Sequence, residues 1–257
     1  MRMRKKPHGI ERLNALSDLL YPFEEIKPEN ITEKPVVMLP DPSSVFTDDL
    51  PLILEVGCGK GDFICAISER DPQCNYIALE KVPDVAVTAV EKYASRRGLG
   101  RMGCNGGWIA DDGTLYPLGE KCPVAPEKRG NVRFAVIEAS EFLSGMADSS
   151  LAGIIANFSD PWTRKSSYSK RRLTSPDFIQ DYRRVLKEGA SFQFKTDDEK
   201  LFDYTLESLE ANGFTVGYCT RDLYSEEDTG DNIITEYERN FMNKGMTIKK
   251  LVAYPKK

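Results

Sequence analysis

The feature that most constrains the fold is an alternation of short apolar runs with amphipathic stretches, which begins at Leu52. The apolar runs lie at 52–56, 76–79, 132–137, 151–156, 191–194, 214–220 and 248–254, and each has the length of a buried strand. Apolar residues recur at helical spacing in 63–70, 83–97, 177–186 and 199–212. This alternation predicts an α/β fold with a mostly parallel seven-stranded sheet and helices on both faces.

Two regions interrupt the alternation. Residues 1–51 are rich in proline and irregular, with one short helical stretch near 10–20, and we treat them as an N-terminal basic extension. Residues 98–130 contain eight glycines and no long periodicity, which indicates an insertion between a helix and the third strand. Asp112-Gly113 is a plausible hairpin turn inside it. The expected division is therefore 1–51 and a domain over 52–257 that carries the insertion.

The residue types present narrow the chemistry. The chain has a single histidine, His8, and six cysteines without a Cys-x-x-Cys pair. Histidine triads, HExxH zinc sites and zinc ribbons are thereby nearly excluded, and no metal site is expected. No apolar run approaches the roughly 18 residues of a membrane helix, and the basic start lacks the apolar region of a secretion signal. We expect a cytoplasmic protein without membrane contact.

The charge is unevenly distributed. The formal net charge is −5, which argues against a protein that coats nucleic acid along its whole surface. Residues 1–12 hold five basic residues and one acidic residue, and residues 160–172 have the same balance, so each segment is net +4. Such a chain can bind nucleic acid locally, and whether the two segments share one face is a structural question.

A glycine-rich loop follows the first apolar run. Gly57, Gly59 and Gly61 form G-x-G-x-G, and Asp62 stands where a dinucleotide fingerprint would have its third glycine. Glu55 lies two residues before the first glycine, where it suits a positively charged ligand and would repel a pyrophosphate. The arrangement is typical of S-adenosylmethionine (SAM) methyltransferases rather than NAD enzymes.

Two more acids end the next two strands. Glu80 lies 19 residues after Gly61, where a carboxylate can accept both ribose hydroxyls of a cofactor. Glu138, followed by Ala139, ends the third strand, where such folds contact an adenine. The simpler alternative is a glycine turn flanked by solvated acids.

The fourth strand ends in Asn157-Phe158-Ser159-Asp160-Pro161-Trp162, at the edge where open α/β sheets do chemistry. A carboxylate and an aromatic beside cations suit a nucleobase on a phosphate backbone. The alternative is a hydrophobic corner next to a solvated basic face. The cations that follow are Arg164, Lys165, Lys170, Arg171 and Arg172.

Two further segments fall at the same rim. Phe194-Lys195-Thr196-Asp197 ends the fifth strand, and Thr235-Glu236-Tyr237-Glu238 opens a predicted last helix. Asp197, Thr235 and Glu238 could hydrogen-bond a base edge. Thr235 and Glu238 have, equally, the spacing of a helix capping box.

Taken together, these motifs closely resemble one family. LEVGCGKG, NFSDPW, KRRLT, FKTD and TEYE occur in the order typical of bacterial tRNA (guanine-N7-)-methyltransferases, which are class I SAM-dependent methyltransferases with a Rossmann-like fold. The resemblance covers nearly the whole chain except 98–130. It implies methyl transfer from SAM to N7 of a guanine in the tRNA variable loop, by a monomer or homodimer without an obligatory protein partner.

The resemblance also implies roles for residues. Asp160 would be the catalytic carboxylate and would border the cofactor. The other cofactor residues would be Glu55, Gly57, Gly59, Gly61, Glu80, Glu138 and Ala139. The substrate residues would be Arg164, Lys170, Arg171, Arg172, Asp197, Thr235, Glu236, Tyr237 and Glu238.

The chain departs from the family pattern in places. The stretch after Asp160 is one residue longer than D-P-W-x-K-x-R-H-x-K-R-R, lacks its Arg-His pair at 166–168 and has Arg164 for the usual lysine. Glu138 stands where aspartate is commoner. The insertion has three open interpretations: a mobile loop, a Cys104–Cys122 pair, or a tRNA contact.

Two rival functions remain at this point. One is a class I methyltransferase that acts on another substrate. The other is a non-catalytic tRNA-binding protein on the same fold, which would predict a degraded glycine loop.

Overall fold

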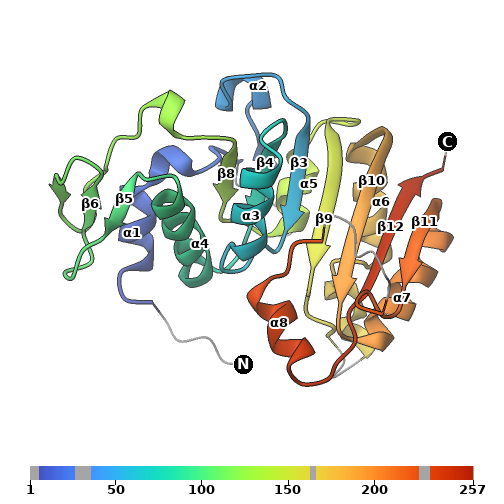
Figure 1. The fold of residues 1–257 in the computed structure, drawn as a ribbon. Coiled ribbons are helices and arrows are strands. Elements are labelled where there is room, and N and C mark those ends of the chain that lie inside the picture. The colour runs from blue at the N-terminus through green and yellow to red at the C-terminus, as the bar shows by residue number, and fades with distance from the viewer. Residues whose placement is uncertain (1–5, 27–35, 163–165, 226–231, 257) are drawn as a thin grey trace.

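The computed structural model describes residues 6–26, 36–162, 166–225 and 232–256, with only the backbone at 166–168. Its centre is a seven-stranded sheet in the order β11-β12-β10-β9-β3-β4-β8 (Figure 1). β12 pairs antiparallel with both neighbours, and the other pairs are parallel. The predicted fold class is confirmed. The strands are β3 (Leu52–Val56), β4 (Asn75–Leu79), β8 (Val132–Ala135), β9 (Leu151–Asn157), β10 (Leu186–Thr196), β11 (Phe214–Thr220) and β12 (Lys249–Pro255).

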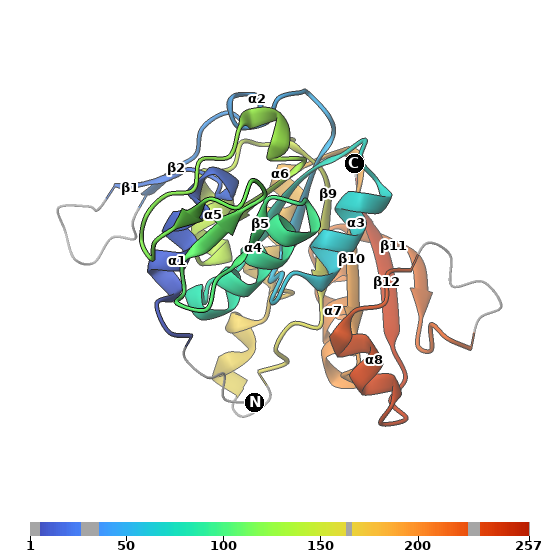
Figure 2. The ribbon, with the colours of Figure 1, turned by 60° about the vertical axis from the view of Figure 1, so that its left-hand side comes forward.

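Helices cover both faces of this sheet, as the two views show (Figure 1, Figure 2). One core cluster contains Phe142 of α5, Ile179 of α6 and Phe202 of α7. The other contains Ile64 of α3 and Val90 of α4. The helices are α3 (Asp62–Arg70), α4 (Pro83–Arg96), α5 (Ala139–Gly145), α6 (Pro176–Val185), α7 (Glu199–Ala211) and α8 (Glu236–Met242). Among the described residues, no helix is long and apolar enough to cross a membrane.

The N-terminal region is more ordered than predicted. It contains α1 (Gly9–Ala15), a 3-10 turn (Ser17–Leu19), the antiparallel pair β1 (Glu24–Ile26) and β2 (Val36–Met38), and α2 (Pro42–Val45). Arg12 is 8% exposed and forms a two-bonded ion pair with Glu91 of α4, at 2.8 and 2.6 Å. The backbone N–H of Tyr21 donates to the oxygen of Phe134 in β8. The region therefore packs on the sheet domain, and Arg12 is not available as a surface cation.

The insertion forms a small antiparallel sheet of its own, which the sequence did not predict. Its strands are β5 (Gly100–Met102), β6 (Trp108–Ala110) and β7 (Leu115–Tyr116). The predicted turn at Asp112-Gly113 is confirmed, because the N–H of Ala110 donates to Thr114 across it and Gly113 has a φ of 86°. Cys104 is exposed and Cys122 is buried, and both are free, so the suggested pair is wrong in this structure.

Asp18 joins the insertion to the N-terminal region. Its carboxylate accepts from Lys121 at 2.8 Å and from the N–H of Val124 at 3.0 Å, and it pairs with Arg129 at 3.1 Å. Burial alone would raise the pKa of Asp18, but these donors and the charge of Arg129 hold it below the usual value. A carboxylate with three partners at one point ties two segments that are far apart in sequence.

We expect Asp18→Asn to destabilise the protein by about 1–2 kcal/mol, because one amide oxygen cannot replace a carboxylate toward three donors. Since the pKa of Asp18 is lowered in the folded state, its stabilising effect is present near neutral pH and is lost as the pH falls below about 4. Urea unfolding at pH 7 and pH 3.5 tests this. Asp111→Asn, at the exposed pair with Lys128, is the control and should change stability by less than about 0.5 kcal/mol. Equal effects of the two variants would contradict the role of Asp18.

Candidate active site

The glycine loop turns the chain from β3 into α3. Gly57, Gly59 and Gly61 all have positive φ, at 78°, 56° and 80°. At Gly61 a side chain would also collide, because an added Cβ would lie 2.8 Å from the Cβ of Ala89 in α4. The loop is held to the neighbouring strand by the N–H groups of Gly57 and Cys58, which donate to the oxygen of Leu79. Glycine is therefore required here by backbone conformation and by the close approach of α4.

Glu55 lies at the end of β3 beneath this loop. It is 2% exposed, and its Oε2 has no hydrogen-bond partner among the described residues. Burial raises the pKa of Glu55 to about 8, although the charge of Lys195 opposes the shift. A buried carboxylate with an unpartnered oxygen is suited to a cationic or hydrogen-donating ligand.

Glu80 and Glu138 occupy the positions that follow β4 and β8. Glu80 accepts from the N–H groups of Gly59 at 3.2 Å and Val82 at 2.9 Å, so it braces the glycine loop and still has lone pairs free for further donors. Burial raises the pKa of Glu80. Glu138 is half-exposed and lies 3.3 Å from Lys81, and the buried Ala139 begins α5 beside it. Glu55 lies within the end of β3, and Glu80 and Glu138 follow β4 and β8, so the three acids lie at the ends of three adjacent strands, as the sequence predicted.

The segment after β9 forms a strained turn. Phe158 and Trp162 have φ angles of 52° and 46°, which large side chains rarely adopt. The N–H of Phe158 donates to the oxygen of Lys195 at 2.8 Å, which holds the turn against β10. Asp160 lies between the two aromatic residues and is exposed. Both side-chain polar atoms of Asn157 and the hydroxyl of Ser159 are buried without a protein partner among the described residues.

The basic residues of the following stretch divide into two kinds. Lys170 and Arg171 are exposed, and the Arg171 guanidinium lies 5.2 Å from the ring centroid of Trp162. Arg172 instead donates to the oxygen of Pro161 at 2.8 Å and lies 4.2 Å from the ring centroid of Tyr204. Arg172 therefore supports the turn that carries Asp160. The predicted substrate residue Arg164, and with it Lys165, lies outside the described residues.

The last helix confirms the capping-box interpretation of Thr235 and Glu238. The Thr235 hydroxyl accepts from the N–H of Glu238 at 3.1 Å, and the Glu238 carboxylate accepts from the N–H of Thr235 at 3.3 Å. Thr235 is 6% exposed and Glu238 is fully buried, so their polar groups already have partners inside the protein. The capping box is confirmed, and direct contact of these two side chains with a base stays a prediction.

Three other predicted substrate residues lie at the same rim with exposed or partly exposed side chains. Tyr237 is 47% exposed, and the half-exposed Glu236 lies 3.5 Å from Lys60 in the glycine loop. Asp197 is half-buried, and burial raises its pKa. Sequence reasoning gave no role to Lys195, whose signal was a lysine directly after the apolar run at 191–194.

Comparison with known proteins decides the family. A family model described as "Putative methyltransferase" matches residues 49–251. The chain belongs to this methyltransferase family, that of tRNA (guanine-N7-)-methyltransferase.

Solved class I methyltransferase structures share its fold. The 16S rRNA methyltransferase KamB is 12% identical, with a TM-score of 0.54, and the match covers 84% of this chain and 92% of KamB. A mutant of the 16S rRNA (adenine(1408)-N(1))-methyltransferase from Catenulisporales acidiphilia, solved with cosubstrate SAM, is also 12% identical, with a TM-score of 0.50 and coverages of 91% and 98%.

SAM is the cofactor of this methyltransferase, and the described residues fit it. The unpartnered Oε2 of Glu55 suits the cationic methionyl end. The positive-φ glycines leave the backbone of the loop open to a ligand, and Glu80 retains acceptor capacity for hydroxyl groups. The non-catalytic alternative predicts a degraded glycine loop. The loop is intact, which argues against that alternative.

We expect Glu55→Gln to weaken SAM binding by about tenfold or more, because a charged hydrogen bond becomes a neutral one. Without ligand, Glu55 is largely protonated below pH 8, and a cationic ligand favours its ionised form. The ratio of variant to wild-type Kd should therefore rise by roughly 20- to 30-fold from pH 6.5 to pH 8.5. Calorimetric titration of both proteins with SAM measures this ratio, in which the titration of SAM itself cancels. A ratio that stays constant over this range would contradict the role of Glu55.

Proposed function

We propose that this methyltransferase transfers the methyl group of SAM to N7 of a guanine in the tRNA variable loop. The observation that carries the proposal is the exposed Asp160 on a strained turn at the carboxyl edge of the sheet. The exposed Lys170 and Arg171 follow ten and eleven residues later, and the Arg171 guanidinium lies against Trp162 of the same turn. A carboxylate next to cations is the arrangement that a base on a phosphate backbone requires. Family membership supports the same substrate.

The proposed chemistry suits a site without histidine. SAM, when bound, supplies an electrophilic methyl group. N7 of guanine has a lone pair and no proton, so the protein need not provide a strong base. Asp160 would stabilise the positive charge that develops on the purine and could accept hydrogen bonds from its N1–H and amine. The main task of the remaining residues is to hold the two reactants in attack geometry.

The other candidate residues divide between cofactor and substrate. The glycine loop, Glu55, Glu80, Glu138 and Ala139 would hold the cofactor, with the acids on its cationic and hydroxyl groups. Lys170 and Arg171 would bind phosphates, while Arg172 acts through Pro161. Asp197 and Tyr237 would border the guanine. Since tRNA matures and acts in the cytoplasm, we propose that the protein works there.

The direct test is incubation of the protein with methyl-labelled SAM and bulk tRNA that lacks 7-methylguanosine, followed by nucleoside mapping. Label in 7-methylguanosine from the variable loop would support the proposal. Ribosomal RNA and a protein extract, offered in parallel, test the alternative of a class I methyltransferase with another substrate. Incorporation into either of these and not into tRNA would refute the tRNA assignment.

We expect Asp160→Ala to lower kcat for tRNA by at least about 100-fold, because the variant lacks the carboxylate that stabilises the cationic product. SAM affinity, measured by calorimetry, should change by less than about threefold. Glu207→Gln, at an exposed position on α7, is the matched control and should keep full activity. Near-normal turnover by Asp160→Ala would show that Asp160 is not the catalytic carboxylate.

We expect the pair Lys170→Gln and Arg171→Gln to weaken tRNA binding and flatten its salt dependence. Each lost phosphate contact should reduce the slope of log K against log salt by about 0.7–0.9. Filter binding between 50 and 200 mM salt measures the slope. Arg172 is left unchanged in this variant because it supports the turn. An unaltered slope would remove the phosphate-contact role of both residues.

A further inference from the structure

The helix α8 is attached to the rest of the protein mainly through a buried charged side chain. Glu238 is the buried residue of this seven-residue helix. So short a helix is not stable alone and depends on tertiary contacts. Here the deepest contact is a carboxylate at 0% exposure rather than an apolar face. The start of α8 is therefore placed by whatever binds Glu238.

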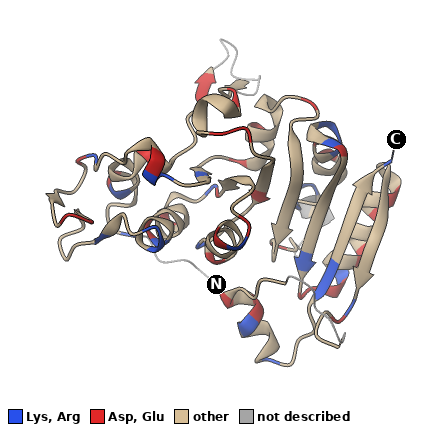
Figure 3. Cartoon of the chain, turned by 45° about the horizontal axis from the view of Figure 1, so that its top comes forward, with Lys and Arg blue, Asp and Glu red and all other residues tan. Residues whose placement is uncertain are grey.

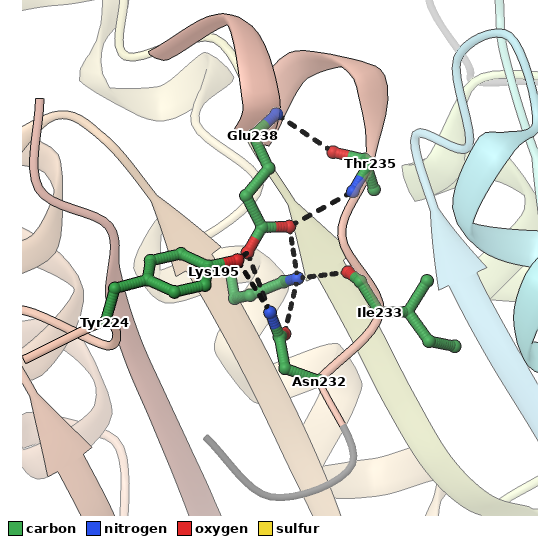
Figure 4. Close-up of polar contacts among 6 residues, drawn as sticks. All are labelled: Lys195, Tyr224, Asn232, Ile233, Thr235 and Glu238. Carbon is green, nitrogen blue, oxygen red and sulfur yellow. Dashed lines mark hydrogen bonds and ion pairs between the residues drawn. The ribbon is translucent and has the colours of Figure 1, made fainter. Parts of the chain in front are cut away.

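Lys195, near the end of β10, is that partner (Figure 4). Its ammonium, also at 0% exposure, donates to Glu238 at 2.8 Å and to Asn232 and the oxygen of Ile233, each at 3.0 Å. All three protons of the ammonium have acceptors. The other oxygen of Glu238 accepts from the hydroxyl of Tyr224 at 2.8 Å and from Asn232 at 2.9 Å. The pair is buried but completely hydrogen-bonded.

The electrostatics agree with an ion pair. Burial would raise the pKa of Glu238, but the charge and hydrogen bond of Lys195 hold it below the usual value. Burial lowers the pKa of Lys195, and Glu238 opposes this shift. The ends of β10 and β12 nearest α8 are basic (Figure 3), so the carboxylate lies in a positive environment.

Lys195 also touches the segments that carry the rest of the candidate site. Its backbone oxygen accepts from Phe158, two residues before Asp160. Its ammonium lies 5.8 Å from the ring centroid of Phe158 and 5.7 Å from that of Phe63, in the first turn of α3 after the glycine loop. Phe158 in turn stacks on Phe241 of α8 at 5.8 Å. One side chain thus contacts elements from the cofactor half and the substrate half.

We propose that Lys195 is a positioning residue, which holds α8 and the segment 232–235 against the turn that carries Asp160 so that the substrate side of the site has one geometry. Glu238 then serves as the anchor of this arrangement. The substrate part of the inference rests on the proposed function, while the docking of α8 does not.

The test compares the full-length wild type with Lys195→Met, Glu238→Gln and the double variant. In Lys195→Met the amides of 232–243 should exchange with deuterium at least tenfold faster, while β9 and α3 keep their protection. The kcat/KM for tRNA, measured at saturating SAM, should fall by about 100-fold. The Kd for SAM should rise by no more than about tenfold, because the charge of Lys195 also favours the ionised form of Glu55. The double variant should recover at least tenfold of the kcat/KM lost by Lys195→Met, because it no longer buries an unpaired carboxylate.

Lys187→Met, an exposed lysine at the other end of β10, is the matched control and should match wild type. Unchanged exchange and unchanged kcat/KM in Lys195→Met would overturn the proposal, as would faster exchange spread evenly over β9, β10 and α7. No recovery in the double variant would also overturn it. If the wild type does not methylate tRNA, the proposed function fails, and the exchange experiment still decides whether Lys195 positions α8.

Discussion

Parallel pairing at the centre of the sheet is the constraint on which the candidate site depends. Leu54 pairs with Ile77 of β4 on one side and with Ile154 of β9 on the other. Parallel strands in register bring their carboxyl ends to one edge. This register brings together the glycine loop, Glu80 and the turn around Asp160, from positions about 100 residues apart in sequence. The position of the polar groups at this edge is therefore set by the pairing of the buried apolar strands.

Much of this arrangement could be predicted from the sequence. The seven strands and the four helices with clear periodicity occur where the sequence pattern predicts them. Each of these elements is long enough for its buried apolar positions to form a recognisable pattern in the sequence. Boundaries shifted where pairing extended an element. Leu186, expected at the end of a helix, begins β10 because it pairs with Leu151 before an irregularity that leads to Ser191. The short α5 was missed because seven residues show hardly two helical turns of pattern.

What could not be predicted depends on contacts between distant segments. The apolar residues of the insertion follow no regular period, and their partners are distant in sequence: Trp108 and Val124 join the second apolar cluster, and Asp18 binds the insertion from the N-terminal region. Thr235 and Glu238 fitted a base contact and a capping box equally well on spacing. The structure shows the capping box and adds a partner that spacing does not reveal, since Glu238 binds Lys195, 43 residues away in sequence. The same separation in sequence explains why the sequence alone assigns no role to Lys195.

The two aromatic residues with left-handed backbone have a further consequence. Phe158 and Trp162 each hold a conformation that costs about 1–2 kcal/mol, and the turn between them is kept by a bond to Lys195 and by stacking on Phe241. These supports belong to a short helix and a strand end, whereas the sheet rests on two large apolar clusters. On heating, α8 can therefore detach and the turn relax while the sheet stays folded. Heat inactivation of such an enzyme would precede its melting, because the candidate site would lose its structure before the sheet unfolds.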